Sequence, residues 1–344
     1  MLLEISKKLN HIDKYPNENV AFSVKPFGQY TKAKDFKHQF LIFLKPEILS
    51  LREGVNIEAV LEFIFDHYQK WGIHVEGVRV LSGAYLHQHN IISKNYETLH
   101  KISHNGLDAC SERVKFRLDE VFVDYNIPKT NILGGHQFLK INPAFSPESL
   151  NKTINSLKTY KLGSGAYAVK LEYKDALYIL LNAFHPFQVN SLTKLGNTII
   201  ALECFSNYPW TLLRHDFVGT VYPEQSKRGS LRRELFEQKE FFNIKTIDIS
   251  NNGVHISPGP IEASFQLINF FVEESNSSDF FLHMTFFRKM NNNIRREIIS
   301  ILRNNPQVNK EGEPYKSSLF EWTEDMNSEE ADKFLKEQYH HFVL

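Results

Sequence analysis

The sequence predicts an α+β fold with a ferredoxin-like, split βαβ core built on an antiparallel four-stranded sheet. Two short apolar runs, at 38–44 and 198–204, are typical of strands that are buried on both faces. Apolar residues at helical spacing follow the first run. When the stretch 104–197 is set aside, strands and helices succeed one another in the order that a split βαβ unit requires.

The first strand begins after a polar segment. Residues 1–36 are rich in lysine with scattered apolar residues, and we expect an extension that packs on the core or is partly mobile. The strand at 38–44 ends at Pro46, because proline has no N–H to donate to a strand ladder. Lys45 is thereby left at the end of a buried strand.

The next helix and strand carry clear boundary signals. Asn56 is a suitable N-cap, and Gly72 closes the helix that follows it. The strand at 73–80 changes its alternation at Gly77, which predicts a β-bulge at the glycine. A helical region follows at 82–102.

Residues 104–197 break this rhythm, and we expect an inserted α+β subdomain there. A short helix is predicted to start at Pro147. Two strand-like runs, 165–172 and 176–181, flank Lys174-Asp175, which predicts a β-hairpin.

The core resumes at the second apolar run. A helix over 210–214, a polar loop over 219–236, a brief strand at 254–256 and a helix at 261–272 follow it. We expect further helices at 280–304 and 328–339. The predicted organisation comprises an N-terminal extension, a core, an insert and a C-terminal helical extension, at 1–36, 37–103 with 198–273, 104–197, and 274–344.

Composition excludes several classes of protein. Lys and Arg number 40, as do Asp and Glu, so no global charge favours nucleic acid or an anionic membrane as a partner. Cys110 and Cys204 are the only cysteines, which predicts a reducing cytoplasmic location rather than a disulfide framework. We expect no signal peptide, no membrane span and no metal site.

Two neighbouring stretches suggest phosphate chemistry. The polar loop from Gly219 ends in basic residues that include Arg232, and His255 lies just before the helix start at Pro260. Arginine binds phosphate oxygens as a planar fork, and a neutral imidazole accepts a phosphoryl group as a nucleophile. One of Arg232 and Arg233 is expected to bind phosphate while the other pairs with an acid such as Glu234 or Glu237; which does which stays open.

Three stretches, in order, resemble the nucleoside diphosphate kinase family. They begin at Phe43-Leu-Lys45-Pro46-Glu47, at Gly219-x-x-x-Pro223-x-x-Ser226-Lys227-x-Gly229-x-x-Arg232, and at Asn252-x-x-His255-x-Ser257. The likeness covers roughly 38–103 and 198–272, under half of the chain.

The resemblance implies a role for each matching residue. His255 resembles the histidine that becomes phosphorylated, and Lys45 and Arg232 resemble the cations on the transferring phosphates. Asn252 resembles the asparagine that contacts the nucleotide, and Ser257 resembles the serine behind the histidine. Charge that spreads over a moving phosphoryl group needs such cations.

The chain departs from the family pattern at several positions. Gln266 stands where the family has a glutamate that bonds the catalytic imidazole; a glutamine oxygen still accepts from the ring N–H. The family arginine before the loop aligns with His215, and Arg214 is the candidate to replace it. The phosphate-binding threonine aligns with Val221, beside Thr220, and a family tyrosine aligns with Asn90.

We therefore expect an ATP-dependent kinase-type transferase that passes a terminal phosphate through a phosphohistidine, with Mg²⁺ on the nucleotide phosphates. The resemblance and the insert favour a nucleotide or a specialised small molecule as acceptor, and a monomer or homodimer rather than a hexamer. The alternatives are a catalytically inactive nucleotide-binding or scaffold module and a structural partner in a complex.

Overall fold

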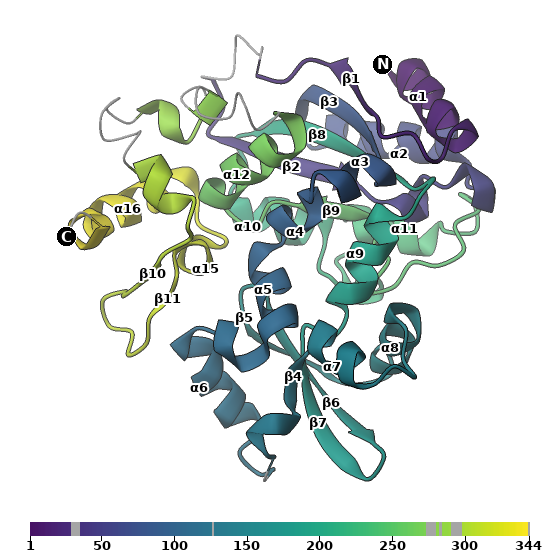
Figure 1. Ribbon diagram of the computed structural model, residues 1–344. Coiled ribbons are helices and arrows are strands. Elements are labelled where there is room, and N and C mark those ends of the chain that lie inside the picture. The colour runs from purple at the N-terminus through teal and green to yellow at the C-terminus, as the bar shows by residue number, and fades with distance from the viewer. Residues whose placement is uncertain (29–34, 126, 273–279, 282–283, 290–297, 343–344) are drawn as a thin grey trace. The chain divides into compact units, whose positions relative to one another are not determined.

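The computed structural model describes residues 1–28, 35–125, 127–272, 280–281, 284–289 and 298–342 (Figure 1). The chain divides into two compact units. The first unit comprises Met1–Ile91, Leu192–Asn304 and Thr323–Leu344, and the second comprises Ile92–Ser191 and Asn305–Trp322. Each unit contains its own sheet with helices, so the predicted α+β class is confirmed.

The sheet of the first unit has five strands in the order β1-β3-β8-β2-β9, and every neighbouring pair is antiparallel. The prediction of four strands is therefore wrong by one. Strand β1 comes from the N-terminal segment, where Phe22 and Val24 pack against the core although polar residues alternate with them in the sequence. The strand bounds are β1 Ala21–Lys25, β2 His38–Leu44, β3 His74–Ser82, β8 Thr198–Ser206 and β9 Val254–Ile256.

Helices cover both faces of this sheet. One face packs into a single apolar core with helices α1, α2 and α10 and with a π-helical turn that continues α10. Helix α12 lies on the opposite face, where Phe43 of β2 stacks on Phe270 with ring centroids 5.2 Å apart. The bounds are α1 Leu2–Lys14, α2 Ile57–Lys70, α10 Trp210–Leu212, the π-helical turn Leu213–Val218 and α12 Pro260–Phe271.

The central strands β2 and β8 are buried along their whole length, as the apolar runs predicted. The predicted bulge in β3 is also confirmed. Val75 pairs with Cys204 and Gly77 pairs with Glu203, so Glu76 is the extra residue. A β-carbon on Gly77 would lie 2.8 Å from the Glu203 carboxylate, which explains why glycine stands at this point.

The helical region predicted over 82–102 is broken into three short helices. Asn90 adopts φ 51°, a left-handed conformation that ends a helix and that asparagine tolerates better than most residues. The helices are α3 Gly83–Gln88, α4 Ile91–Asn95 and α5 Glu97–Asn105.

The second unit is built on a four-stranded sheet in the order β4-β7-β6-β5. Strands β6 and β7 form the predicted hairpin, and Lys174 and Asp175 at its turn both have positive φ, as a tight right-twisted hairpin requires. Strand β4 runs parallel to β7. The bounds are β4 Ile132–Gly134, β5 Thr159–Gly163, β6 Ala166–Tyr173, β7 Ala176–Leu181, α6 Glu112–Val121, α7 Gly135–Ile141, α8 Pro147–Ile154 and α9 His185–Thr193.

The C-terminal segment is not helical throughout, which corrects the prediction. A short hairpin of β10 (Gln307–Val308) and β11 (Ser317–Ser318) precedes α15 (Leu319–Thr323). Within the second unit, the Trp322 indole donates to the Val308 carbonyl at 3.0 Å. Helix α16, Ser328–Phe342, confirms the predicted final helix, whereas much of 280–304 lies outside the described residues.

Among the described residues, no helix combines the length and apolar character needed to cross a membrane. Cys110 and Cys204 are buried free thiols.

Candidate functional site

The candidate site is centred on His255 in β9. Its neighbour across the sheet is Phe43 of β2, and the two rings stack with centroids 4.6 Å apart and planes 20° apart. Because side chains alternate along a strand, Lys45 points to the same sheet face as Phe43. The sheet register thus places an imidazole and a lysine together at the ends of two paired strands.

Gln266 and Ser257 hold the other edge of the imidazole. The Gln266 side-chain oxygen lies 3.2 Å from His255 Nε2 and accepts a hydrogen bond from Ser257 Oγ at 2.7 Å. Because an amide oxygen only accepts, His255 Nε2 carries the proton, and Nδ1 carries the lone pair. This is the contact that the sequence led us to expect from Gln266.

The environment keeps this imidazole neutral. His255 is half-buried, and desolvation lowers its pKa to about 3, with further lowering by Lys45, Arg232 and Arg214 in that order. The hydrogen bond with Gln266 acts in the opposite direction. The electrostatic interaction of three cations with one ring shows that the structure brings the predicted charged residues to the same place.

Lys45 is buried and bonded within the site. Its Nζ donates to the Asn252 side-chain oxygen at 2.7 Å. Burial lowers the pKa of Lys45 to about 8; Glu47 and Asp248 oppose this effect, and Arg232 adds to it. The Glu47 carboxylate accepts a hydrogen bond from the backbone N–H of Gly253 at 2.8 Å. Lys45 and Glu47 are thus both bonded to the residues that lead into the His255 strand.

Arg232 is buried and connects the polar loop to β9. Its guanidinium donates to the Gly219 carbonyl at 2.8 Å and, through Nε and Nη2, to the Val254 carbonyl at 3.2 and 2.6 Å. Arg233 pairs with Glu237 at 2.6 Å on the exposed side of α11, Leu231–Glu237. Of the two adjacent arginines, Arg232 is therefore the one that turns into the site.

Gly219 is required where this loop starts. It adopts φ 96°, and a β-carbon there would lie 2.7 Å from Ser230 Oγ and 3.0 Å from Ser226 Oγ. Thr220, a predicted nucleotide-binding residue, is exposed, and its hydroxyl bonds to the Tyr222 carbonyl and to Ser226 within the same loop.

Arg214 has partners that the sequence gave no reason to expect. Its guanidinium donates to Glu324 at 3.0 Å and to Asp325 at 2.6 Å, and both carboxylates raise its pKa against the effect of burial. Asp325 also donates its backbone N–H to the Pro258 carbonyl at 3.0 Å. The segment that follows α15 is therefore fastened beside the His255 strand through Arg214.

Glu262 is a site residue that we did not identify from the sequence. It lies one helical turn before Gln266 in α12, and its carboxyl accepts from Gln266 Nε2 at 3.0 Å. Burial and the neighbouring Glu324 raise the pKa of Glu262 to about 8, while Arg214 and Gln266 act in the opposite direction. The i, i+4 spacing of a carboxyl and an amide is the sequence signal that would have revealed this pair.

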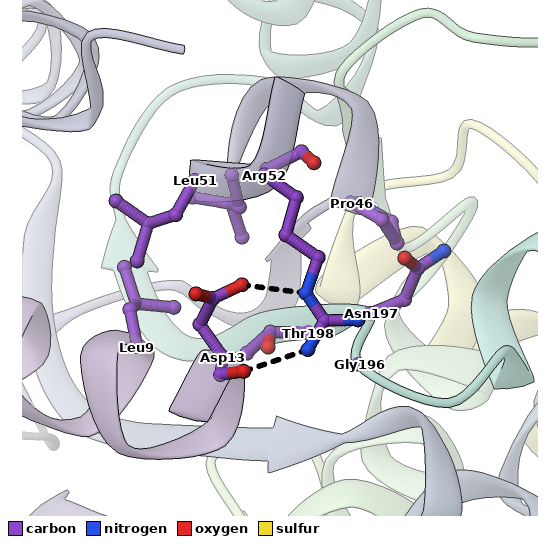
Figure 2. A pocket seen from close by; sticks show the side chains of 10 residues that line it. Leu9, Asp13, Pro46, Leu51, Arg52, Gly196, Asn197 and Thr198 are labelled. Atoms are coloured by element: carbon purple, nitrogen blue, oxygen red, sulfur yellow. Dashed lines mark hydrogen bonds and ion pairs between the residues drawn. The ribbon is translucent and has the colours of Figure 1, made fainter. Parts of the chain in front are cut away.

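A small pocket in the first unit lies elsewhere. Figure 2 shows Arg52 across it, with Nε donating to the Asp13 carboxylate at 2.8 Å and Nη2 donating to the Asp13 carbonyl at 2.6 Å. None of the predicted site residues lines this pocket. Its lining comprises Leu9, Asp13, Pro46, Leu49, Ser50, Leu51, Arg52, Gly196, Asn197 and Thr198.

The second unit contains a group of four imidazoles in mutual contact, here called the histidine cluster: His100, His104, His136 and His185. His104 and His136 stack with centroids 3.8 Å apart, and His100 Nδ1 lies 3.3 Å from His185 Nε2. Among the described residues, no three His, Cys, Asp or Glu side chains are arranged to hold a metal ion.

No protein-family model matches this chain, and no curated protein matches it either.

Proposed function

We propose that this chain is an ATP-dependent phosphotransferase of nucleoside diphosphate kinase type, working through a phosphohistidine at His255. One observation carries the proposal. A neutral imidazole has its Nε2–H directed to the Gln266 oxygen, so that its lone pair is on Nδ1, and Lys45 and Arg232 lie within electrostatic range.

The fold of the first unit supports this proposal. Strands β3-β8-β2-β9 form an antiparallel run within the sheet. The connection from β2 to β3 passes through α2, and the connection from β8 to β9 passes through α10, and both helices pack into the same core. A ferredoxin-like, split βαβ core has this order and places both crossover helices on one face.

The chemistry is a two-step transfer. In the first step, His255 Nδ1 attacks the terminal phosphorus of ATP, a P–N bond forms, the bond to the bridging oxygen breaks, and ADP leaves with that electron pair. No proton is lost from Nδ1, because Nε2 already holds the ring proton. In the second step, an anionic oxygen of the acceptor attacks the phosphorus, the P–N bond breaks, and its electron pair returns to Nδ1, so that the ring regains its starting state.

The cations stabilise the charge that develops during this transfer. Lys45 and Arg232 supply positive charge, Asn252 orients Lys45, and Mg²⁺ is carried on the nucleotide phosphates. Arg214 also acts electrostatically on His255, but it forms ion pairs with Glu324 and Asp325. The acceptor, on this proposal, is a nucleotide or a specialised small molecule.

Incubation with γ-labelled ATP tests the proposal. Wild-type protein should acquire one label that is lost in acid and kept in alkali, and His255→Ala should acquire none. His74→Ala is the matched control, because His74 is an exposed histidine of the same unit, half of whose side chain is accessible. Absence of label on the wild type, or equal label on His255→Ala, would refute the proposal.

A second candidate function is nucleotide binding without turnover. Two observations favour it: Gln266 supplies no charge to stabilise an imidazolium, and two carboxylates already hold Arg214. Calorimetry that shows ATP binding, together with no phosphoryl exchange and no labelled histidine, would establish this function instead.

A further inference from the structure

We propose that Glu262 is a positioning residue that selects which nitrogen of His255 acts as the nucleophile, through the orientation of the Gln266 amide. This inference rests on the phosphotransferase function proposed above. It concerns a residue that does not itself touch the imidazole.

The side-chain amide of glutamine has an oxygen that accepts hydrogen bonds and an NH₂ group that donates them. With its oxygen toward His255, Gln266 requires the ring proton on Nε2 and leaves the lone pair on Nδ1. With the amide turned by half a revolution, its NH₂ group would face Nε2, which would then become the acceptor. The ring proton would move to Nδ1 and block attack from that nitrogen.

Two contacts determine which end faces the ring. Ser257 Oγ lies 2.7 Å from the Gln266 oxygen, but a hydroxyl both donates and accepts, so it tolerates either orientation. Glu262 Oε1 lies 3.0 Å from Gln266 Nε2, and an ionised carboxylate only accepts. Once ionised, Glu262 is therefore the contact that distinguishes the two orientations.

The helix makes this contact a rigid one. Glu262 and Gln266 lie one turn apart in α12, so their side chains share a face without any loop between them. Gln266 is almost fully buried, which prevents water from replacing a lost partner. The imidazole of His255 therefore has no carboxylate bonded to Nε2; the Glu262 carboxyl acts on it through the Gln266 amide.

The charged surroundings of Glu262 make the effect depend on pH. Arg214 and Glu324 face it in addition to Gln266, and its pKa of about 8 reflects burial first and Glu324 second. As pH rises through this value, Glu262 becomes a carboxylate, which accepts hydrogen bonds more strongly than the neutral acid. The selection of the Nε2–H tautomer should therefore strengthen as the solution becomes more alkaline.

Nitrogen NMR of the full chain with ¹⁵N-labelled histidine measures the tautomer directly. The His255 signals are assigned by their absence in His255→Ala. Above pH 8, where Glu262 is ionised, wild type should show the Nε2–H tautomer, whereas in Glu262→Ala the ratio of the two tautomers should shift toward Nδ1–H by about tenfold, as expected for the loss of one buried hydrogen bond. Glu262→Gln, which like the protonated acid both donates and accepts, should match the wild-type ratio at pH 7 and show no change around pH 8.

An unchanged tautomer in Glu262→Ala, with the protein folded, would overturn the inference and assign the amide orientation to Ser257 alone. If Glu262→Ala does not fold, the pH response decides: an unaltered response in Glu262→Gln would equally overturn it. The labelling experiment is separate. Tautomer control by Glu262 without any phosphohistidine would show that the proposed function fails while the positioning contact exists.

Discussion

Mild acid should destabilise the second unit, because the histidine cluster is neutral when folded. Burial and neighbouring imidazoles lower the pKa of His136 to about 3 and that of His185 to about 4, against 6.5 when exposed. The unfolded state therefore binds more protons below pH 6.5, and stability is lost as pH falls through that window. From pH 7 to pH 5 the buried His185 removes about 2 kcal/mol from the free energy of unfolding, and the more exposed His136 removes about 1 kcal/mol because solvent screens its interactions.

Hydrogen exchange with mass spectrometry locates this effect in the full chain. After correction for the intrinsic pH dependence of exchange, peptides from β6 and β7 should lose about 3 kcal/mol of protection between pH 7 and pH 5. Peptides from β2 and β8 of the first unit should not show this loss of protection with falling pH. In the double variant His136→Gln/His185→Gln, protection of the second unit should depend less on pH. The variant should also be less stable than the wild type at pH 7, because packing is lost.

His74→Gln provides the control, since His74 is exposed and lies outside the cluster. If the slope in β6 and β7 is the same for the wild type and the double variant, the assignment of acid sensitivity to the histidine cluster is wrong.

Three further predictions concern the first unit. Burial raises the pKa of Glu203 to about 7, so stability should fall as pH rises from 4.5 to 7, and Glu203→Gln should flatten this slope in urea titrations; an unchanged slope contradicts it. Gly77→Ala should cost about 2 kcal/mol of unfolding free energy, because its new β-carbon meets Glu203, and an unchanged urea midpoint would refute this. Arg214→Leu should cost about 3 kcal/mol by leaving two carboxylates without their partner. Lys227→Ala breaks an exposed pair and should cost about 0.5 kcal/mol, so equal losses would contradict the role of burial.

Local signals in the sequence predicted much of the fold. The strands at 38–44 and 198–204 followed from short, mainly apolar runs, and the bulge at Gly77 followed from a change in alternation. The hairpin at Lys174-Asp175 followed from two apolar runs separated by polar residues. Strand β1 was missed because five residues with mixed polarity gain their stability from β3, whose paired residues lie 53 to 60 positions further along the chain.

The contacts of the candidate site likewise fall into those between residues close in the sequence, which could be predicted, and those between distant residues, which could not. His255 and Gln266 lie on a strand and the helix that follows it, so a fixed interval in the sequence relates them. The contacts of Arg214 with Glu324 and Asp325 join residues about 110 positions apart, and no local pattern encodes such a pair. The histidine cluster likewise draws its members from three helices.

The N-terminal segment has a consequence for how this protein is handled and how it assembles. Ile5, Leu9 and Ile12 of α1 belong to the central core, and β1 forms a hydrogen-bonded ladder with β3. A shortened chain that begins at residue 37 would therefore expose an apolar surface and leave β3 as a bare sheet edge, open to pairing with another molecule. The segment predicted as an extension thus covers part of the apolar core and occupies the hydrogen-bonding edge of β3.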